Sequence, residues 1–208
     1  MVEIKEMSYD EKYSGVLGYM NLLDDYCLPI VEKELGAQKV AELKRIWQNE
    51  EQPISEDATA QEKFETVYGN WVRKWAGAFN FVSANLGEKG VEKFKYEAIE
   101  ALKRKSASPA LFLLKIVRVL SPQVAFRMLA KQMSYQLQVF TPFSVSELSG
   151  NRLVMNMHPC KVLDIPDCEA FCTIGCQDIW ARWLEGQFKA GMITNRQGKN
   201  CIVTVTPL

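Results

Sequence analysis

The chain has 208 residues, of which 48% are hydrophobic, 24% charged and 11% aromatic, a composition that excludes a disordered or low-complexity protein and allows a buried core without disulfides. Lysine and arginine number 25, as do aspartate and glutamate, so no excess of positive charge favours nucleic acid as a partner. Residues 1–104 nevertheless carry 14 basic and 19 acidic side chains, whereas residues 105–208 carry 11 and 6, which makes the second half the better place for an anionic ligand.

Apolar residues at helical spacing dominate the first two-thirds of the chain. We expect one helix that ends near Cys27, one or two helices that cover residues 29–48, with Pro29 and Gly36 as breaks, and then an acidic loop over residues 51–60. The most regular pattern is an aromatic face that runs from Gln61 to Ala84. Further helices are expected over residues 91–105, over residues 109–120 and from residue 122 onward.

The pattern changes after about Gln136. Two strands are expected at residues 136–140 and 153–157, a helix over residues 167–188, and one or two strands that end with residues 199–206. The predicted fold class is therefore α+β, with a helical N-terminal region, residues 1–135, packed on a small antiparallel sheet with one cysteine-bearing helix, residues 136–208. We expect the two parts to form one continuous globular unit.

The chain shows no sign of an anchor or an export signal. Its most apolar stretch, Ala110 to Leu120, is interrupted by Lys115 and Arg118 and is too short to span a bilayer. The N-terminus lacks an apolar signal segment. We therefore expect a cytoplasmic protein with no membrane partner, whose six cysteines are thiols, metal ligands or redox groups and not disulfides.

Five of the six cysteines fall within the last 49 residues. Three of them, Cys168, Cys172 and Cys176, are four residues apart and would lie along one stripe of an α-helix. Cys160 ends the strand before this helix, and Cys201 lies in the last strand, which would pack beside the first in an antiparallel sheet. We expect all five thiols to converge on one pocket.

Three chemistries are open to these thiols. Cys160, Cys168, Cys172 and Cys176 supply four ligands for zinc or an iron–sulfur cluster, although common sites place two residues between ligands. A cysteine in the first turn of the helix, Cys168 above all, could instead be a nucleophile. The third interpretation is that cysteine, a small and often buried residue, simply packs in the core.

Three other side chains near the cysteines are candidates for the site. His158, the only histidine, could act as a general base or bind a ligand, and its being single excludes a multi-histidine metal site. Asp178 is the candidate acid–base or substrate-orienting group. Arg196 could bind a substrate carboxylate through two hydrogen bonds.

The C-terminal segments together resemble a known family. The strand ending in Cys160, the segment from Asp167 to Cys172, the helix through Asp178 and the closing residues 198–203 (GKNCIV) resemble L-2-amino-thiazoline-4-carboxylic acid hydrolase-like proteins. They are also similar to the small-molecule-binding 4-vinyl reductase domain, which ends with a glycine turn, a cysteine and a final strand. The resemblance implies hydrolysis of a cyclic C=N bond in a cysteine-related heterocycle.

Two functions follow as hypotheses. The first is a thiol-dependent hydrolase of a small carboxylate-bearing heterocycle, in which Cys160, Cys168 or Cys172 is the nucleophile, Asp178 directs water, and Arg196 and His158 bind the substrate. The second is a small-molecule or redox sensor whose clustered cysteines hold zinc or an iron–sulfur cluster. In both cases the expected partner is a small molecule, and the tryptophan-rich helical surfaces leave a homodimer open.

Overall fold

The computed structural model describes residues 4–106, 109–157, 159–166 and 168–208. The elements in chain order are α1 (Tyr9–Leu35), α2 (Ala37–Glu50), α3 (Ala60–Ser106), α4 (Pro109–Leu120), α5 (Pro122–Leu137), β1 (Phe143–Leu148), β2 (Leu153–Met157), the 3-10 helix η1 (Lys161–Asp164), the π-helix η2 (Phe171–Ile179), α6 (Trp180–Phe188), β3 (Ala190–Gln197) and β4 (Asn200–Pro207). No helix in these described ranges is long and apolar enough to cross a membrane.

The first helix is longer than the sequence predicts. It begins at a capping box, in which the Ser8 hydroxyl accepts the backbone N–H of Glu11 while the Glu11 carboxylate accepts that of Ser8. It then continues through Pro29 and ends at Gly36, whose φ of 86° is readily adopted by glycine. The predicted break at Pro29 is wrong because fully buried neighbours, such as Cys27 and Val31, hold both sides of the proline in the core.

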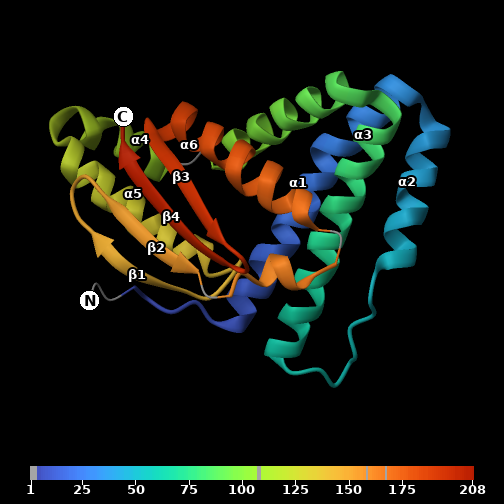
Figure 1. The fold of residues 1–208 in the computed structure, drawn as a ribbon, viewed down its shortest axis with the longest axis horizontal. Coiled ribbons are helices and arrows are strands. Elements are labelled where there is room, and N and C mark those ends of the chain that lie inside the picture. The colour runs from blue at the N-terminus through green and yellow to red at the C-terminus, as the bar shows by residue number, and fades with distance from the viewer. Residues whose placement is uncertain (1–3, 107–108, 158, 167) are drawn as a thin grey trace.

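The helices expected over residues 61–84 and 91–105 form one long element, α3, interrupted only at Gly87, where φ is 60°. Packed along α1 (Figure 1), it contributes the aromatic part of the core. Phe94 is fully buried among the rings of Tyr26, Trp75 and Phe79, with ring centroids 5.1, 5.6 and 5.9 Å away. The aromatic face is therefore core, as its helical spacing indicates.

The sheet is antiparallel, with the strand order β1-β2-β4-β3. The strand expected at residues 153–157 and the closing strand are both present, but the strand expected at residues 136–140 is wrong. Those residues end α5 and form a turn. They are apolar because Val139 and Phe140 pack into the helical core, where the Phe140 ring lies 5.3 Å from that of Trp71.

One face of the sheet is buried. Alternate residues of the two central strands point into the core: Leu153, Met155 and Met157 on β2, and Cys201, Val203 and Val205 on β4. Side chains of α5 and of η2 line a cavity together with side chains of β2 and β4. The molecule is thus an α+β protein, with a helical N-terminal region, a small antiparallel sheet and one cysteine-bearing helical segment.

The aromatic core gives a matched test of stability. We expect Phe94→Ala to lower the free energy of unfolding by about 3–5 kcal/mol, because a buried ring is replaced by a cavity. Tyr96→Ala on the same helix is the control, since Tyr96 is 61% exposed and should change stability by about 0.5 kcal/mol or less. Urea unfolding followed by circular dichroism measures both, and equal losses would contradict this account of the core.

Candidate functional site

A partly open cavity of about 60 Å³ lies between the buried face of the sheet, α5 and η2. Four of the five clustered cysteines line it, as their positions in the sequence predict. Its described lining residues are Met133, Leu137, Phe140, Thr141, Met157, Cys160, Val162, Leu163, Phe171, Cys172, Cys176, Trp180, Met192, Thr194, Arg196, Cys201 and Val203. The residues that line the cavity therefore come from segments between α5 and the last strand, β4.

The strand register explains why Cys201 and Arg196 meet in this cavity. In the antiparallel sheet Cys201 is paired with Met157 on one side and with Arg196 on the other, so the three side chains form one row across the buried face. The backbone N–H of Cys160 donates to the carbonyl of Lys199 at 2.8 Å. That bond ties the loop after β2 to the β3–β4 turn and brings Cys160 next to Cys201.

A buried threonine, which sequence analysis missed, holds the other side of the Cys160 loop. The Thr141 hydroxyl donates to the carbonyl of Pro159 at 3.0 Å and accepts the backbone N–H of Lys161 at 3.3 Å. Thr141 is 3% exposed, so these bonds are shielded from water. The Cys160 loop is thus fixed from both sides before any ligand binds.

The cysteine-bearing helix is a π-helix where Cys172 and Cys176 lie, and this changes the predicted stripe. A π-helix bonds residue i to i+5, so residues four apart are slightly less than one turn apart. Cys168 precedes the helix and faces α3, with its sulfur donating to the carbonyl of Val72 at 4.0 Å. The prediction that all five thiols share the pocket is wrong for Cys168, which does not line it.

Three of the thiols in the cavity are held in the neutral form. Burial raises the pKa of Cys201 to about 11 and also raises the pKa of Cys160. Burial raises the pKa of Cys176 well above its usual value, and the neighbouring thiols Cys160, Cys172 and Cys201 add to the effect. Backbone N–H groups of Val162 and Leu163 point at Cys160 and oppose its shift without overcoming it.

Cys172 has a different environment because a cation and an amide face it. The Gln177 side-chain amide donates to the Cys172 sulfur at 3.7 Å. The Arg196 guanidinium donates to Glu169 at 2.8 Å, and this bond is the main cause that raises the pKa of Arg196, with the Cys172 sulfur adding to it. Among the four thiols in the cavity, Cys172 is thus the one whose sulfur lies beside both the Gln177 amide and the Arg196 guanidinium.

The remaining predicted site residues do not join the cavity. Asp178 does not line it and instead forms ion pairs with Lys95 at 2.8 Å and with Arg182 at 2.5 Å. Residues two apart point to different sides of a helix, so Cys176 and Asp178 diverge. The expected role of Asp178 in directing water is therefore not supported by its position. His158 lies outside the described residues.

A buried tyrosine on α3 also lies beside the cysteines, and sequence analysis assigned it only to the core. Burial raises the pKa of Tyr68 well above its usual value, and Cys160, Cys176 and Cys168 add to the shift. Its hydroxyl is buried and makes no hydrogen bond within the described part of the chain. It is a polar group whose partner could be a ligand or water.

The cysteines do not form a ready metal site. Over the described residues, no three histidine, cysteine, aspartate or glutamate side chains are grouped so that they could hold a metal ion. The four predicted ligands are also divided, since Cys168 faces α3 and the other three line the cavity. The geometry thus does not fit the predicted zinc or iron–sulfur cluster.

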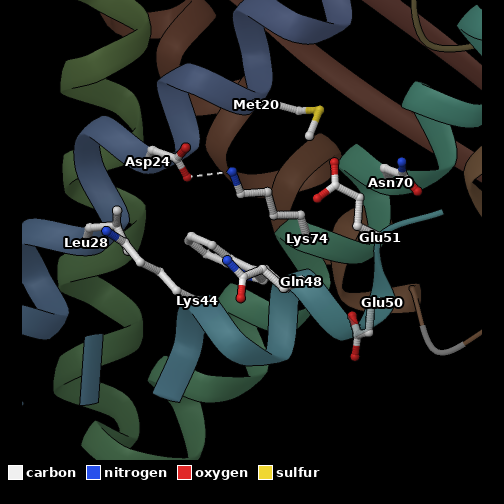
Figure 2. Close-up of a pocket in the computed structure, with 10 residues that line it drawn as sticks. Met20, Asp24, Leu28, Lys44, Gln48, Glu50, Glu51, Asn70 and Lys74 are labelled. Carbon is white, nitrogen blue, oxygen red and sulfur yellow. Dashed lines mark ion pairs between the residues drawn. The ribbon is translucent and has the colours of Figure 1, made fainter. Parts of the chain in front are cut away.

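A second cavity, of about 290 Å³, lies between α1, α2 and α3. Figure 2 shows Asp24 and Lys74 pointing toward each other across it, and their ion pair measures 2.6 Å. The Lys74 ammonium also lies 4.6 Å from the ring centroid of Trp47. None of the side chains predicted for the site lines this cavity, and its central charges already have partners.

Comparisons with known proteins do not identify the chain. No family model matches its sequence, and no curated protein matches it. Among solved structures, the crystal structure of a mutant Fe(II) unliganded H-NOX protein from K. algicida is similar over 89% of this chain and 94% of that chain, with 12% identity and a TM-score of 0.36. A likeness this weak supports no inference about fold or function.

The different thiol environments predict an order of chemical labelling. At pH 7.5 we expect iodoacetamide to modify Cys172 before Cys160, Cys176 and Cys201, because raised pKa values keep the latter three neutral. Labelling of Cys201 should rise only as the pH approaches its pKa of about 11. Peptide mass spectrometry of time-resolved samples measures the order, and faster labelling of Cys201 at pH 7.5 would contradict it.

Two matched variants test the role of the arginine. Arg196→Gln should slow the labelling of Cys172, since it removes the guanidinium that lies beside the sulfur. Glu169→Gln should speed it, because the carboxylate that now engages Arg196 is lost. Rates that move in the same direction in both variants would show that the guanidinium does not govern Cys172.

Proposed function

We propose that the protein is a small-molecule-binding module of the sensor type, whose ligand occupies the cavity between the sheet and the cysteine-bearing helix. The observation that carries the proposal is that cysteines from three separate segments, together with Arg196, line one partly open, mainly apolar cavity. Concave, mainly apolar cavities with a few directed polar groups are the usual form of small-ligand sites. The resemblance to the 4-vinyl reductase domain points the same way.

The lining indicates the chemistry of the ligand. Its walls are aromatic, aliphatic and sulfur-containing side chains, and Arg196 is the one charged group among the described residues that line it. The volume of about 60 Å³ has room for a few non-hydrogen atoms. We therefore expect a small and largely apolar ligand that directs one anionic or accepting group at Arg196.

Binding accounts for the cavity better than hydrolysis does. Neutral thiols are poor nucleophiles, and the pKa values of three of the four thiols are raised. Hydrolysis also needs a base to activate water, but no carboxylate stands among the described lining residues and Asp178 is engaged by Lys95 and Arg182. The metal-holding form of the sensor is not part of the proposal, because the cysteine positions do not fit one.

A thiol-dependent hydrolase is the second candidate, favoured by the environment of Cys172. The Arg196 guanidinium and the Gln177 amide both lie at its sulfur. In this candidate function Cys172 adds to the carbon of the C=N bond of a 2-amino-thiazoline ring, and its proton passes to the ring nitrogen. The bond from that carbon to the ring sulfur then breaks, and the ring sulfur leaves as a thiol. Water adds to the same carbon and the Cys172 thiol leaves, so that the product is the ring-opened carbamoyl compound. The resemblance to the amino-thiazoline carboxylate hydrolase-like family supports this reading.

We also propose that the protein works in a reducing compartment such as the cytoplasm. Four cysteines, Cys160, Cys172, Cys176 and Cys201, are thiols and line a single cavity. Neighbouring thiols in an oxidising compartment are readily converted to disulfides. The proposed ligand site depends on these thiols remaining reduced.

Ligand binding can be tested with acetate and isopropanol, two probes of about four non-hydrogen atoms that differ in charge and match the volume of the cavity. Either probe should raise the unfolding temperature, and saturation at a hundred times Kd adds about 2.7 kcal/mol to stability. Arg196→Gln should weaken acetate about tenfold and leave isopropanol unchanged, because only acetate needs the cation. Arg182→Gln is the control, since Arg182 does not line the cavity. If neither probe stabilises the protein, or both variants behave alike, the proposed site is wrong.

The hydrolase is tested separately with 2-amino-thiazoline-4-carboxylate. If the protein is a binding module, it should leave the ring intact. Chromatography of the mixture over time measures the amount of intact compound. Turnover that is lost in Cys172→Ala and retained in Cys168→Ala would instead support the hydrolase, because only Cys172 lines the cavity. Equal turnover in the two variants would exclude Cys172 as the nucleophile.

A further inference from the structure

The hairpin of α4 and α5 exposes an apolar surface far from the helix α2, near the C-terminus (Figure 1). α4 packs chiefly on α5, so much of its apolar side is left uncovered. The hairpin surface consists of six exposed apolar residues: Leu113, Ile116, Val119, Leu120, Val124 and Met128. Val119 and Leu120 are 82% and 80% exposed, which is far more than scattered surface residues require.

The hairpin surface is also positive. From residue 101 to residue 146 the sequence contains seven lysines and arginines and no aspartate or glutamate. Four of these cations, Lys115, Arg118, Arg127 and Lys131, belong to the hairpin itself. Apolar residues interleaved with cations on one helical surface are typical of helices that lie in the interface of a membrane with anionic lipids.

A cavity of about 300 Å³ opens beside the hairpin and has the same character. Leu114, Phe126, Leu129, Phe188 and Leu208 provide apolar walls. Three cations, Lys115, Arg118 and Lys189, line it as well, and no described lining residue is acidic. Apolar walls beside cations suit an amphiphile with a negative headgroup.

We propose that the hairpin surface binds an anionic lipid bilayer, with α4 and α5 lying in the plane of the interface. The six exposed apolar residues enter the headgroup–acyl boundary, and the hairpin cations contact lipid phosphates. The cavity beside the hairpin takes part of one lipid. The sequence argument against a membrane partner concerned the length needed to span a bilayer, and a helix that lies on the surface needs no such length.

A second copy of the chain fits this surface less well. In a symmetric dimer the same surface would face itself, and four cations of one copy would meet four of the other. The hairpin contains no carboxylate that could neutralise them. Anionic lipid supplies both the negative charge and the apolar environment that the surface lacks.

Co-sedimentation of the full chain with vesicles tests the proposal. We expect binding to phosphatidylcholine vesicles that contain phosphatidylglycerol, weaker binding in high salt, and little binding to phosphatidylcholine alone. The double variant Val119→Glu and Leu120→Glu should abolish binding, whereas Ile193→Glu, at a residue 71% exposed on β3, should not. Lys131→Gln should weaken binding about fivefold, and Lys33→Gln on α1 is its control.

Circular dichroism and light scattering complete the design. All the substituted residues are exposed, so the variants should keep the helical spectrum of the parent. Equal binding to neutral and anionic vesicles, or binding that survives the double variant, would overturn the proposal. A third result would also overturn the proposal: the protein binds no vesicles and forms a dimer in solution that the double variant dissociates. The hairpin surface would then be an interface between two copies of the chain.

Discussion

The pairing of β2 with β4 is the constraint on which the cavity depends. Its register sets Met157 opposite Cys201 and, through β3, Cys201 opposite Arg196. Side chains alternate between the faces of a strand, so a shift of one residue would turn Cys201 to the outer face. The bond from the Cys160 N–H to the carbonyl of Lys199 depends on the same register. Cys160 and Cys201, which are distant in sequence, thus meet because two strands pair in one way.

The periodicity of apolar residues correctly predicts helices and strands that bury only one face. The aromatic repeat of α3 and the alternation of β2 and β4 each bury one face, and there the sequence is a good guide. Periodicity gives a wrong prediction where apolar residues are buried by contacts with other elements of the fold. Val139 and Phe140 are apolar because they pack against helices, and α1 passes Pro29 because its buried neighbours hold it. Both errors reflect tertiary packing, which a local pattern does not contain.

The site is predictable to the same extent. Clustering in the sequence and the two strand positions correctly bring Cys160, Cys172, Cys176 and Cys201 to one cavity. Asp178 was misassigned because its partner Lys95 comes from a helix 83 positions earlier in the chain. Thr141 and Tyr68 were missed for a related reason, since a lone hydroxyl residue carries no pattern that marks what it will contact.

Arg196 connects the two candidate functions and makes them compete. It lies beside the Cys172 sulfur, and it is also the one charged group in the described lining that could receive a ligand carboxylate. A carboxylate bound to Arg196 would compete with Glu169, which already pairs with the guanidinium. An anionic ligand therefore occupies the same guanidinium that the hydrolase candidate uses beside Cys172. The arrangement that permits binding thus limits covalent chemistry in the occupied cavity.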